Sequence, residues 1–218
     1  MKEGAANTLE QGLARELRCR DTSSVVEREF MKKLVYYIVS TLDGFIAGPD
    51  HQFDFFTAND HFPYLIEEFP ETFPVQARAP LGITAPNKHF DTVLMGRGTY
   101  TPGLNIGITS PYPQLRQVVF SSSIAPETEP TIEFASGDAL KRVRELKQEE
   151  GLDIWLCGGG NLAYQLLPEI DELIVKLNPL VVGQGIPLFA GPFQLQQFQL
   201  VSTKTFASGV LILHYARQ

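Results

Sequence analysis

The chain has 218 residues, of which 44% are hydrophobic and 20% are charged, and its formal net charge at pH 7 is −7. This length and apolar content predict a folded protein with a sizeable core. The negative charge and the lack of a basic stripe argue against nucleic acid as a partner. No apolar run is long enough to cross a bilayer and the N-terminus lacks a secretory signal pattern, so we expect no membrane partner.

The two cysteines, Cys19 and Cys157, lie far apart in the sequence and in dissimilar surroundings. This spacing predicts neither a disulfide framework nor a metal site, and it favours a cytoplasmic location. Residues 1–31 are polar and of mixed charge, with only a short amphipathic stretch. We therefore predict a poorly ordered leader over 1–31 and one folded domain over 32–218.

Short apolar segments rich in β-branched and aromatic residues recur through this domain and predict strands. The first is nearly continuous in its apolarity, which is typical of a central strand buried on both faces. Strands are predicted at 34–39, 92–95, 116–120, 154–157 and 172–178, and a hairpin at 198–206 and 210–215. Helical spacing of apolar residues predicts helices over 137–149, capped by Ser136, and between Gly160 and Pro168.

Residues 51–90 have an irregular pattern in which aromatic residues are mixed with acids and prolines. Residues 60–69 could form one helix, whereas 70–87 are typical of a long loop. A loop of that length in a compact domain is usually functional or disordered. We therefore interpret 51–90 as an insertion or lid.

Three predicted strands end in residues that suit phosphate binding. Gly158-Gly159-Gly160 opens a helix, where unpaired amides at the positive end of the dipole can hold an anion. Gly96-Arg97-Gly98-Thr99 adds a guanidinium and a hydroxyl, and Ser121-Ser122 adds two more hydroxyls. Open α/β sheets bind ligands at this edge. A simpler interpretation stays open for each segment alone: glycines that only allow tight packing, or an arginine that pairs with a surface acid.

The three strand ends taken together, from Met95-Gly96-Arg97-Gly98-Thr99-Tyr100 onward, resemble the dihydrofolate reductase-like superfamily in order and spacing. Within it, Ser40-Thr41-Leu42-Asp43-Gly44-Phe45-Ile46-Ala47 is most similar to the reductase (C-terminal) domain of the riboflavin-biosynthesis bifunctional deaminase-reductase and its stand-alone relatives. The resemblance implies an α/β fold with a mostly parallel central sheet flanked by helices and an antiparallel C-terminal hairpin. It also implies NADPH as cofactor.

The resemblance assigns cofactor-binding roles in three groups. The 2′-phosphate of NADPH would be bound by Arg97 with Ser121 or Ser122. The pyrophosphate would be contacted at one helix start by Gly96 and Thr99, and at the other by Gly158, Gly159, Gly160, Asn161 and Leu162. The nicotinamide would lie against the backbone of Val39, Ile46 and Ala47.

The substrate side is less defined, because the Pro-Trp pair and helix carboxylate of dihydrofolate reductases are not identifiable in this sequence. Asp54 and Asp60, in the predicted lid, are the candidate catalytic proton donors. Asp43 is interpreted as ordering the turn that meets the nicotinamide. Lys176 either touches substrate or is a solvated strand end, and we prefer the second interpretation.

These features predict an NADPH-dependent reductase that transfers hydride to a small heterocyclic or carbonyl substrate. By resemblance it is most like 5-amino-6-(5-phosphoribosylamino)uracil reductase of riboflavin biosynthesis or a dihydrofolate or pteridine reductase. The alternative is a non-catalytic NADP(H)-binding module, because a fold does not guarantee its chemistry. Besides a small-molecule substrate, the expected partner is a second copy of the chain in a homodimer.

Overall fold

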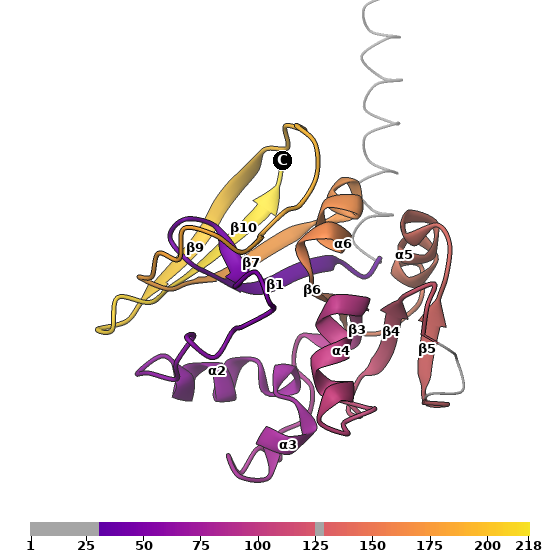
Figure 1. The fold of residues 1–218 in the computed structure, drawn as a ribbon, viewed down its shortest axis with the longest axis horizontal. Helices are drawn as coiled ribbons and strands as arrows, with labels where there is room; N and C mark the ends of the chain where they lie inside the picture. Colours follow the sequence, from indigo (N-terminus) through magenta and orange to yellow (C-terminus); the bar gives the residue numbers. More distant parts are fainter. Residues whose placement is uncertain (1–30, 125–128) are drawn as a thin grey trace, which may run out of the picture. The chain divides into compact units, whose positions relative to one another are not determined.

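An eight-stranded sheet in the order β5-β4-β3-β6-β1-β7-β10-β9 forms the centre of the protein (Figure 1). The computed structural model describes residues 31–124 and 129–218, and residues 32–218 form one compact unit. Apart from Met31, the predicted leader over 1–31 lies outside the described residues, and so does Cys19.

Six strands of the sheet run parallel, and the two C-terminal strands run antiparallel to their neighbours. The parallel strands are β1 (Leu34–Ser40), β3 (Phe90–Gly96), β4 (Arg116–Phe120), β5 (Ile132–Ala135), β6 (Asp153–Gly158) and β7 (Glu172–Leu177). The antiparallel strands are β9 (Phe198–Thr205) and β10 (Leu211–Arg217). The predicted fold class is therefore confirmed, although β5 was not expected from the sequence.

The central strand β1 is buried on both faces, as its continuous apolarity predicted. Val35 and Tyr37 pack into one core cluster, while Leu34 and Tyr36 pack into the other, and all four side chains are at most 3% exposed. Strand geometry causes this division, because successive side chains point to opposite faces. The cluster that contains Tyr37 is called the lower core here, and the cluster that contains Tyr36 the upper core.

Helices cover both faces of the sheet. On the lower-core side lie α2 (Phe62–Glu68), the 3₁₀ turn η1 (Pro70–Thr72), α3 (Val75–Arg78) and α4 (Arg97–Asn105). On the upper-core side lie α5 (Ala139–Lys147), α6 (Gly160–Gln165) and the 3₁₀ turn η3 (Leu167–Glu169). Figure 1 shows α5 and α6 on the opposite side of the sheet from α2 and α3. No helix in the described ranges is both long and apolar enough to cross a membrane.

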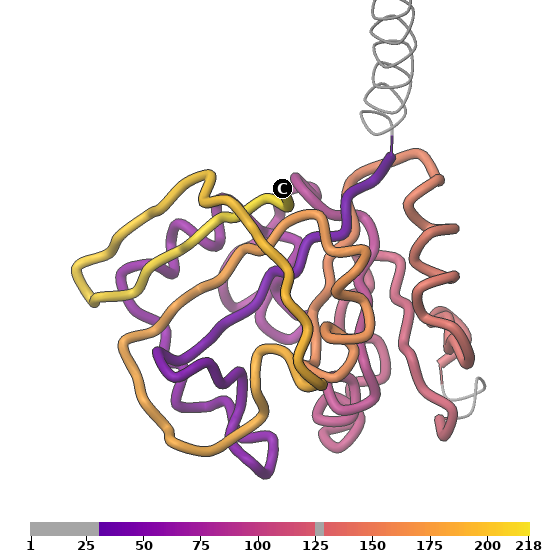
Figure 2. The backbone as a smooth tube through the Cα atoms, turned by 90° about the horizontal axis from the view of Figure 1, so that it is seen from above, coloured from indigo at the N-terminus to yellow at the C-terminus, as the bar shows by residue number. Residues whose placement is uncertain are grey.

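A second, two-stranded sheet pairs β2 (Phe45–Ala47) with β8 (Ile186–Pro187) in antiparallel fashion. Neither strand was expected, because both are very short and their pairing joins residues about 140 positions apart. In Figure 2 the chain before β8 curves around the β1–β2 connection, and the β9–β10 hairpin lies at the opposite end of the sheet from α5.

The segment before β3 contains more regular structure than its irregular sequence indicates. The helix expected over 60–69 is α2, whereas the expected loop over 70–87 contains η1 and α3. Leu65, Phe69 and Phe73 enter the lower core. The fully buried Glu71 accepts hydrogen bonds from the backbone amides of His89 (2.7 Å) and Phe90 (2.9 Å), which ties the segment to β3. Burial of these aromatic rings explains why the segment is ordered.

The helix predicted over 137–149 is α5, and its cap differs from the prediction. Asp138 rather than Ser136 is the N-cap, and its carboxylate accepts a hydrogen bond from the Lys141 amide at 3.2 Å. Gly137 between them has a φ of +113°, which turns the chain so that the helix starts two residues later.

Candidate active site

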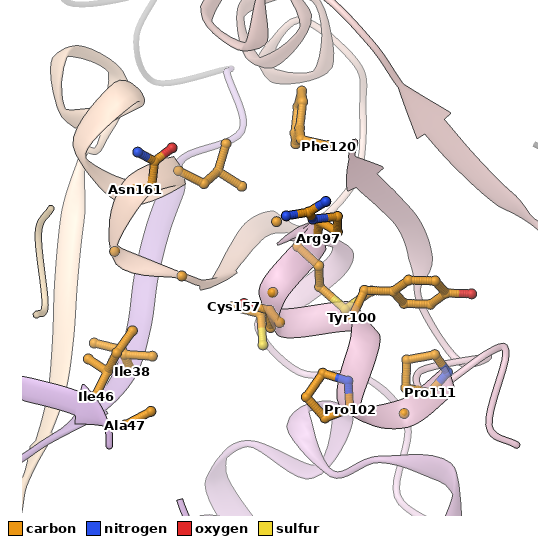
Figure 3. Close-up of a pocket in the computed structure, with 18 of the residues that line it drawn as sticks. Ile38, Ile46, Ala47, Arg97, Tyr100, Pro102, Pro111, Phe120, Cys157 and Asn161 are labelled. Atoms are coloured by element: carbon orange, nitrogen blue, oxygen red, sulfur yellow. The ribbon is translucent and has the colours of Figure 1, made fainter. Parts of the chain in front are cut away.

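A cavity of about 890 Å³ lies at the carboxyl edge of the parallel strands, where Figure 3 shows its lining residues. It is lined by the ends of β1, β3, β4, β6 and β7, by the starts of α4 and α6, and by the segment from His51 to Gln76. Twelve of the thirteen predicted cofactor residues line it: Val39, Ile46, Ala47, Gly96, Arg97, Thr99, Ser121, Ser122, Gly159, Gly160, Asn161 and Leu162. The thirteenth, Gly158, is buried and has a φ of +133°.

Two helices begin at the cavity, and each start lacks a side-chain cap. α4 follows β3 with Gly96 as N-cap, and α6 follows β6 with Gly159 as N-cap. Both helix starts therefore present backbone amides that no capping side chain occupies. The two starts are neighbours, because a Cβ added to Gly96 would lie 3.6 Å from the Gly159 nitrogen. This pair of amide clusters suits a pyrophosphate.

Gly160 has a packing role in addition to its place in the cavity wall. A Cβ at this position would lie 2.1 Å from the Pro187 carbonyl oxygen, and the Gly160 carbonyl accepts a hydrogen bond from the Ala190 amide at 3.0 Å. The close approach of the segment around β8 therefore requires glycine. The simpler interpretation of the glycine run, that it allows tight packing, applies to this residue.

Arg97 lies at the exposed end of the cavity, at the first position of α4. Its Nη1 atom donates to Ser123 Oγ at 3.3 Å, and the Ser121 Oγ accepts from the Ser123 amide at 3.2 Å. Ser123 is thus a partner that the sequence analysis missed, although it belongs to the same run of serines. Within the described residues Arg97 forms no salt bridge, so a guanidinium and several hydroxyls share one surface without a paired carboxylate there.

The turn after β1 is held by Asp43. Its carboxylate accepts hydrogen bonds from Thr41 Oγ1 (2.6 Å) and from the amides of Gly183 (2.7 Å) and Val182 (3.2 Å). The hydrogen bond from Thr41, followed by those from the two amides, lowers the pKa of Asp43. These contacts connect the β1–β2 turn to the segment before β8, and Ile46, which follows this turn on β2, lines the cavity.

The two candidate proton donors do not line the cavity. Asp54 and Asp60 are both exposed, and the Asp60 carboxylate accepts a hydrogen bond from the Ser208 amide at 3.2 Å. Hydrogen bonding by Ser208 lowers the pKa of Asp60, which favours the ionised form. No other Asp or Glu of the described chain lines the cavity.

The part of the cavity called the aromatic end here combines side chains on the lower-core face of the sheet with side chains from the segments before α2 and β4. Its lining residues are Tyr37, Phe53, Phe56, Pro111, Tyr112, Trp155, Cys157 and Lys176. Trp155 packs edge to face on Tyr112 with ring centroids 5.0 Å apart, and its Nε1 donates to the Tyr37 carbonyl at 2.9 Å. Figure 3 shows Cys157 and Pro111 with Ile38 and Ile46 around the cavity.

Titratable groups at the aromatic end are shifted by burial. Burial raises the pKa of Cys157 to about 12 and raises that of Tyr112 well above its ordinary value, so both stay protonated at neutral pH. Burial lowers the pKa of Lys176 to about 8. The expectation that Lys176 is a solvated strand end is therefore wrong, because its side chain lines the cavity. The sequence pattern did not reveal that Lys176 lines the cavity, because a lysine one residue before the end of strand β7 is also typical of a solvated strand end.

The fold and the site define an α/β protein of the dihydrofolate reductase-like class, with its cavity at the carboxyl edge of a mostly parallel sheet. Residues 32–212 match the family of the RibD C-terminal domain, and the chain belongs to this family of dihydrofolate reductase-like reductases.

Two similar proteins come from Bacillus subtilis (strain 168). YwjB is 32% identical over 188 residues, which cover 85% of this chain and 98% of YwjB. YyaP is 29% identical over 198 residues, which cover 84% of this chain and 94% of YyaP. Both are described as uncharacterized proteins.

Three solved structures share the fold. A putative riboflavin biosynthesis protein from Shewanella sp. PV-4 has a TM-score of 0.62 and 20% identity, covering 86% of this chain and 99% of that chain. The Thermotoga maritima diaminohydroxyphosphoribosylaminopyrimidine deaminase/5-amino-6-(5-phosphoribosylamino)uracil reductase has a TM-score of 0.58 and 17% identity. The match covers 87% of this chain and 58% of the Thermotoga chain. Enterococcus faecalis dihydrofolate reductase, complexed with NADP(H), has a TM-score of 0.61 and 14% identity. The match covers 87% of this chain and 98% of the Enterococcus chain.

Proposed function

We propose that this chain is an NADPH-dependent reductase that transfers hydride to a small heterocyclic substrate at the aromatic end of the cavity. The observation that carries the proposal is the continuity of one cavity, about 890 Å³ in volume, from Arg97 and the two uncapped helix starts to the aromatic floor. That volume suits a cofactor with a small substrate. The substrate class is proposed by analogy with the Thermotoga uracil reductase and the Enterococcus dihydrofolate reductase, which share the fold.

The residues present fit NADPH. In this proposal the Arg97 guanidinium and the hydroxyls of Ser121 and Ser122 hold the 2′-phosphate, because planar donors and hydroxyls suit a phosphate. Amides at the starts of α4 and α6 hold the pyrophosphate. The backbone near Val39 and Ala47, which line the cavity, would hold the nicotinamide. When bound, the cofactor supplies the hydride, and the chain orients it and excludes water.

The second candidate is a non-catalytic NADP(H)-binding module. It is favoured by one observation: the described residues that line the cavity include no carboxylate to act as a conventional acid. The two candidates differ in turnover and agree on cofactor binding. The only tryptophan, Trp155, lines the cavity and provides the signal for cofactor binding.

The test titrates NADPH and NADH against Trp155 fluorescence and then follows NADPH absorbance with oxidised pterins and ribosylaminouracil compounds. We expect saturable NADPH binding that is much tighter than NADH binding, followed by oxidation with at least one compound. Binding without oxidation would favour the module. Absence of NADPH binding would refute both candidates.

The cytoplasm, where the Cys157 thiol stays reduced, is the proposed location.

A second copy of the chain is the proposed protein partner. β9 is the last strand of the sheet, and its Leu200 and Val201 are 51% and 56% exposed. An edge strand with exposed apolar side chains favours pairing with another chain. Light scattering should give a dimer mass, and the Leu200→Asp, Val201→Asp double variant should be monomeric. A monomeric unaltered protein would contradict the proposal.

A further inference from the structure

The register of the sheet brings Lys176 to the floor of the cavity. On β7 it pairs with Val39 of β1 on one side and with Ile212 of β10 on the other. It is two residues beyond Ile174, which packs in the lower core together with Tyr37 and Trp155. Because residues two apart in a strand share a face, the Lys176 side chain projects on the same side as these rings.

The ammonium of Lys176 is held by aromatic and neutral groups. Its Nζ lies 5.0 Å from the centroid of the Tyr37 ring, a cation–π distance. No salt bridge joins it to any described acid. The titratable groups at this end are the Tyr37 hydroxyl on β1, the Cys157 thiol on β6 and the Tyr112 hydroxyl before β4. The His61 imidazole before α2 does not line the cavity, but it is close enough to Lys176 for their charges to interact.

At neutral pH each of these neighbours is uncharged. Burial keeps the Cys157 thiol and the Tyr112 hydroxyl protonated, because it raises the pKa of both. Burial, followed by the charge of Lys176, lowers the pKa of His61, which keeps the imidazole neutral. Lys176 therefore carries the positive charge at the aromatic end. Two other lining residues have basic groups, Arg97 and His51. Arg97 is the first residue of α4, and His51 packs beside the start of this helix, because a Cβ on Gly98 would lie 3.1 Å from its ring.

We propose that Lys176 is the catalytic proton donor and that it selects a planar heterocycle which presents a hydrogen-bond acceptor, a carbonyl oxygen or imine nitrogen, to its ammonium. The inference deepens the proposed function and rests on it. An ammonium has donors only, so it binds acceptor edges and repels cationic amidine edges. A 2,4-dioxopyrimidine ring fits this requirement, and a 2,4-diaminopyrimidine does not.

The proposed reaction step is balanced in protons and electrons. The substrate C=N or conjugated C=C bond accepts the hydride that NADPH supplies at one atom, so the substrate is reduced and NADPH is oxidised to NADP⁺. The Lys176 N–H bond breaks, and its proton goes to the substrate nitrogen or oxygen that gains the electron pair. The neutral amine then takes a proton from solvent. Burial lowers the pKa of Lys176 to about 8, near the operating pH, which suits an acid that is used and reloaded.

The first test observes the amine directly and needs no turnover. Nitrogen-15 NMR of labelled lysine side chains, with the Lys176 signal assigned from Lys176→Arg, should show titration near pH 8 instead of the ordinary value near 10.5. A normal titration would overturn the proposal. This result does not depend on NADPH binding, so it distinguishes failure of this inference from failure of the proposed function.

The second test measures ligand selection in the NADP⁺ complex with 5-amino-6-ribitylaminouracil and with trimethoprim as the diaminopyrimidine. Lys176→Met should weaken uracil binding about 10-fold or more, as expected for a lost charge-assisted hydrogen bond. It should change NADPH affinity less than twofold. Lys204→Met is the matched control, because Lys204 also lies over a ring, 4.2 Å from the Tyr64 centroid, but outside this cavity. Tighter binding of trimethoprim than of the uracil would refute the selection.

The third test is the pH profile of single-turnover NADPH oxidation with 5-amino-6-ribosylaminouracil. The unaltered enzyme should lose rate above about pH 8, as Lys176 loses its proton. Lys176→Met should be roughly 100- to 1,000-fold slower, as for loss of a general acid, and should lack that limb. Lys176→Arg, which keeps the charge but not the acidity, should retain uracil binding and stay slow. An unchanged profile in Lys176→Met, or no fall above pH 8 in the unaltered enzyme, would contradict the role.

Discussion

The two ends of the cavity are built by different means. The cofactor end consists mainly of backbone at the starts of α4 and α6, with Arg97 and three serines on an exposed rim. The aromatic end consists of side chains on one face of the sheet, with Lys176 as its cation. Backbone amides recognise phosphates without regard to the rest of a ligand, whereas a floor of side chains is specific to one substrate. In the proposed function, cofactor choice therefore belongs to Arg97 and substrate choice to Lys176.

The largest effect is expected from breaking the backbone frame at the cofactor end. Gly160→Ala would bring a Cβ to within 2.1 Å of the Pro187 carbonyl oxygen. Relieving that contact must shift the segment around β8, so we expect a loss of about 3 kcal/mol in the free energy of unfolding. Urea denaturation measures this. Gly96→Ala is the control, because its nearest contacts would be 3.6 Å and its φ is −78°. Equal stability of both variants would contradict the packing role of Gly160.

The second-largest effect is expected on the preference for NADPH over NADH. Arg97→Ala removes the guanidinium from the rim while leaving the helix amides in place. We expect NADPH affinity to fall about 100-fold with little change for NADH, because a charged pair with phosphate is lost. Trp155 fluorescence titration measures both. Ser123→Ala removes only the hydrogen-bond partner of Arg97. We expect this variant to lose less than about 10-fold in NADPH affinity, as expected for a neutral hydrogen bond. Parallel losses for NADH and NADPH would show that Arg97 does not read the 2′-phosphate.

Replacing Lys176 at the aromatic end should change the free energy of unfolding as well as the reaction rate. The pKa of Lys176 is about 8 in the folded protein and 10.5 ordinarily, so burying the charged amine costs stability below pH 8. This cost declines as pH rises from 8 toward 10.5, because the unfolded chain binds more protons there. Lys176→Met should therefore raise stability at pH 7 by on the order of 2 kcal/mol. Urea unfolding at pH 7 and pH 9.5 should show the gap shrinking, and a constant gap would exclude a shifted amine.

The smallest effect is expected outside both ends. Asp60→Asn should change NADPH oxidation less than about twofold, because a carboxylate that binds a backbone amide away from the cavity is not positioned for proton transfer. Asp54→Asn should behave in the same way. Steady-state kinetics at pH 7 decides the matter. A hundredfold loss in either variant would restore the sequence-based hypothesis and displace Lys176.

Local patterns predicted most of the scaffold. Continuous apolarity identified β1, glycines marked the ends of β3 and β6, and a run of serines marked the end of β4. Twelve of thirteen predicted cofactor residues line the cavity, since parallel strands end at one edge of a sheet. The short strands β2 and β8 were missed, because their pairing depends on residues about 140 positions apart. The helical turns within the expected loop over 70–87 were also missed, since the order of this stretch follows from side chains such as Phe73 that enter the core.

By itself the sequence determined the mostly parallel sheet with its C-terminal hairpin, the family resemblance and the phosphate-friendly strand ends. These depend on local periodicity, turn residues and strand direction, which neighbouring residues encode. Only the tertiary structure decided which charged groups line the cavity: it left Asp54 and Asp60 outside and turned Lys176 into it. The reason is physical, because the direction, burial and pKa of a side chain are set by strand register and by distant residues packed around it.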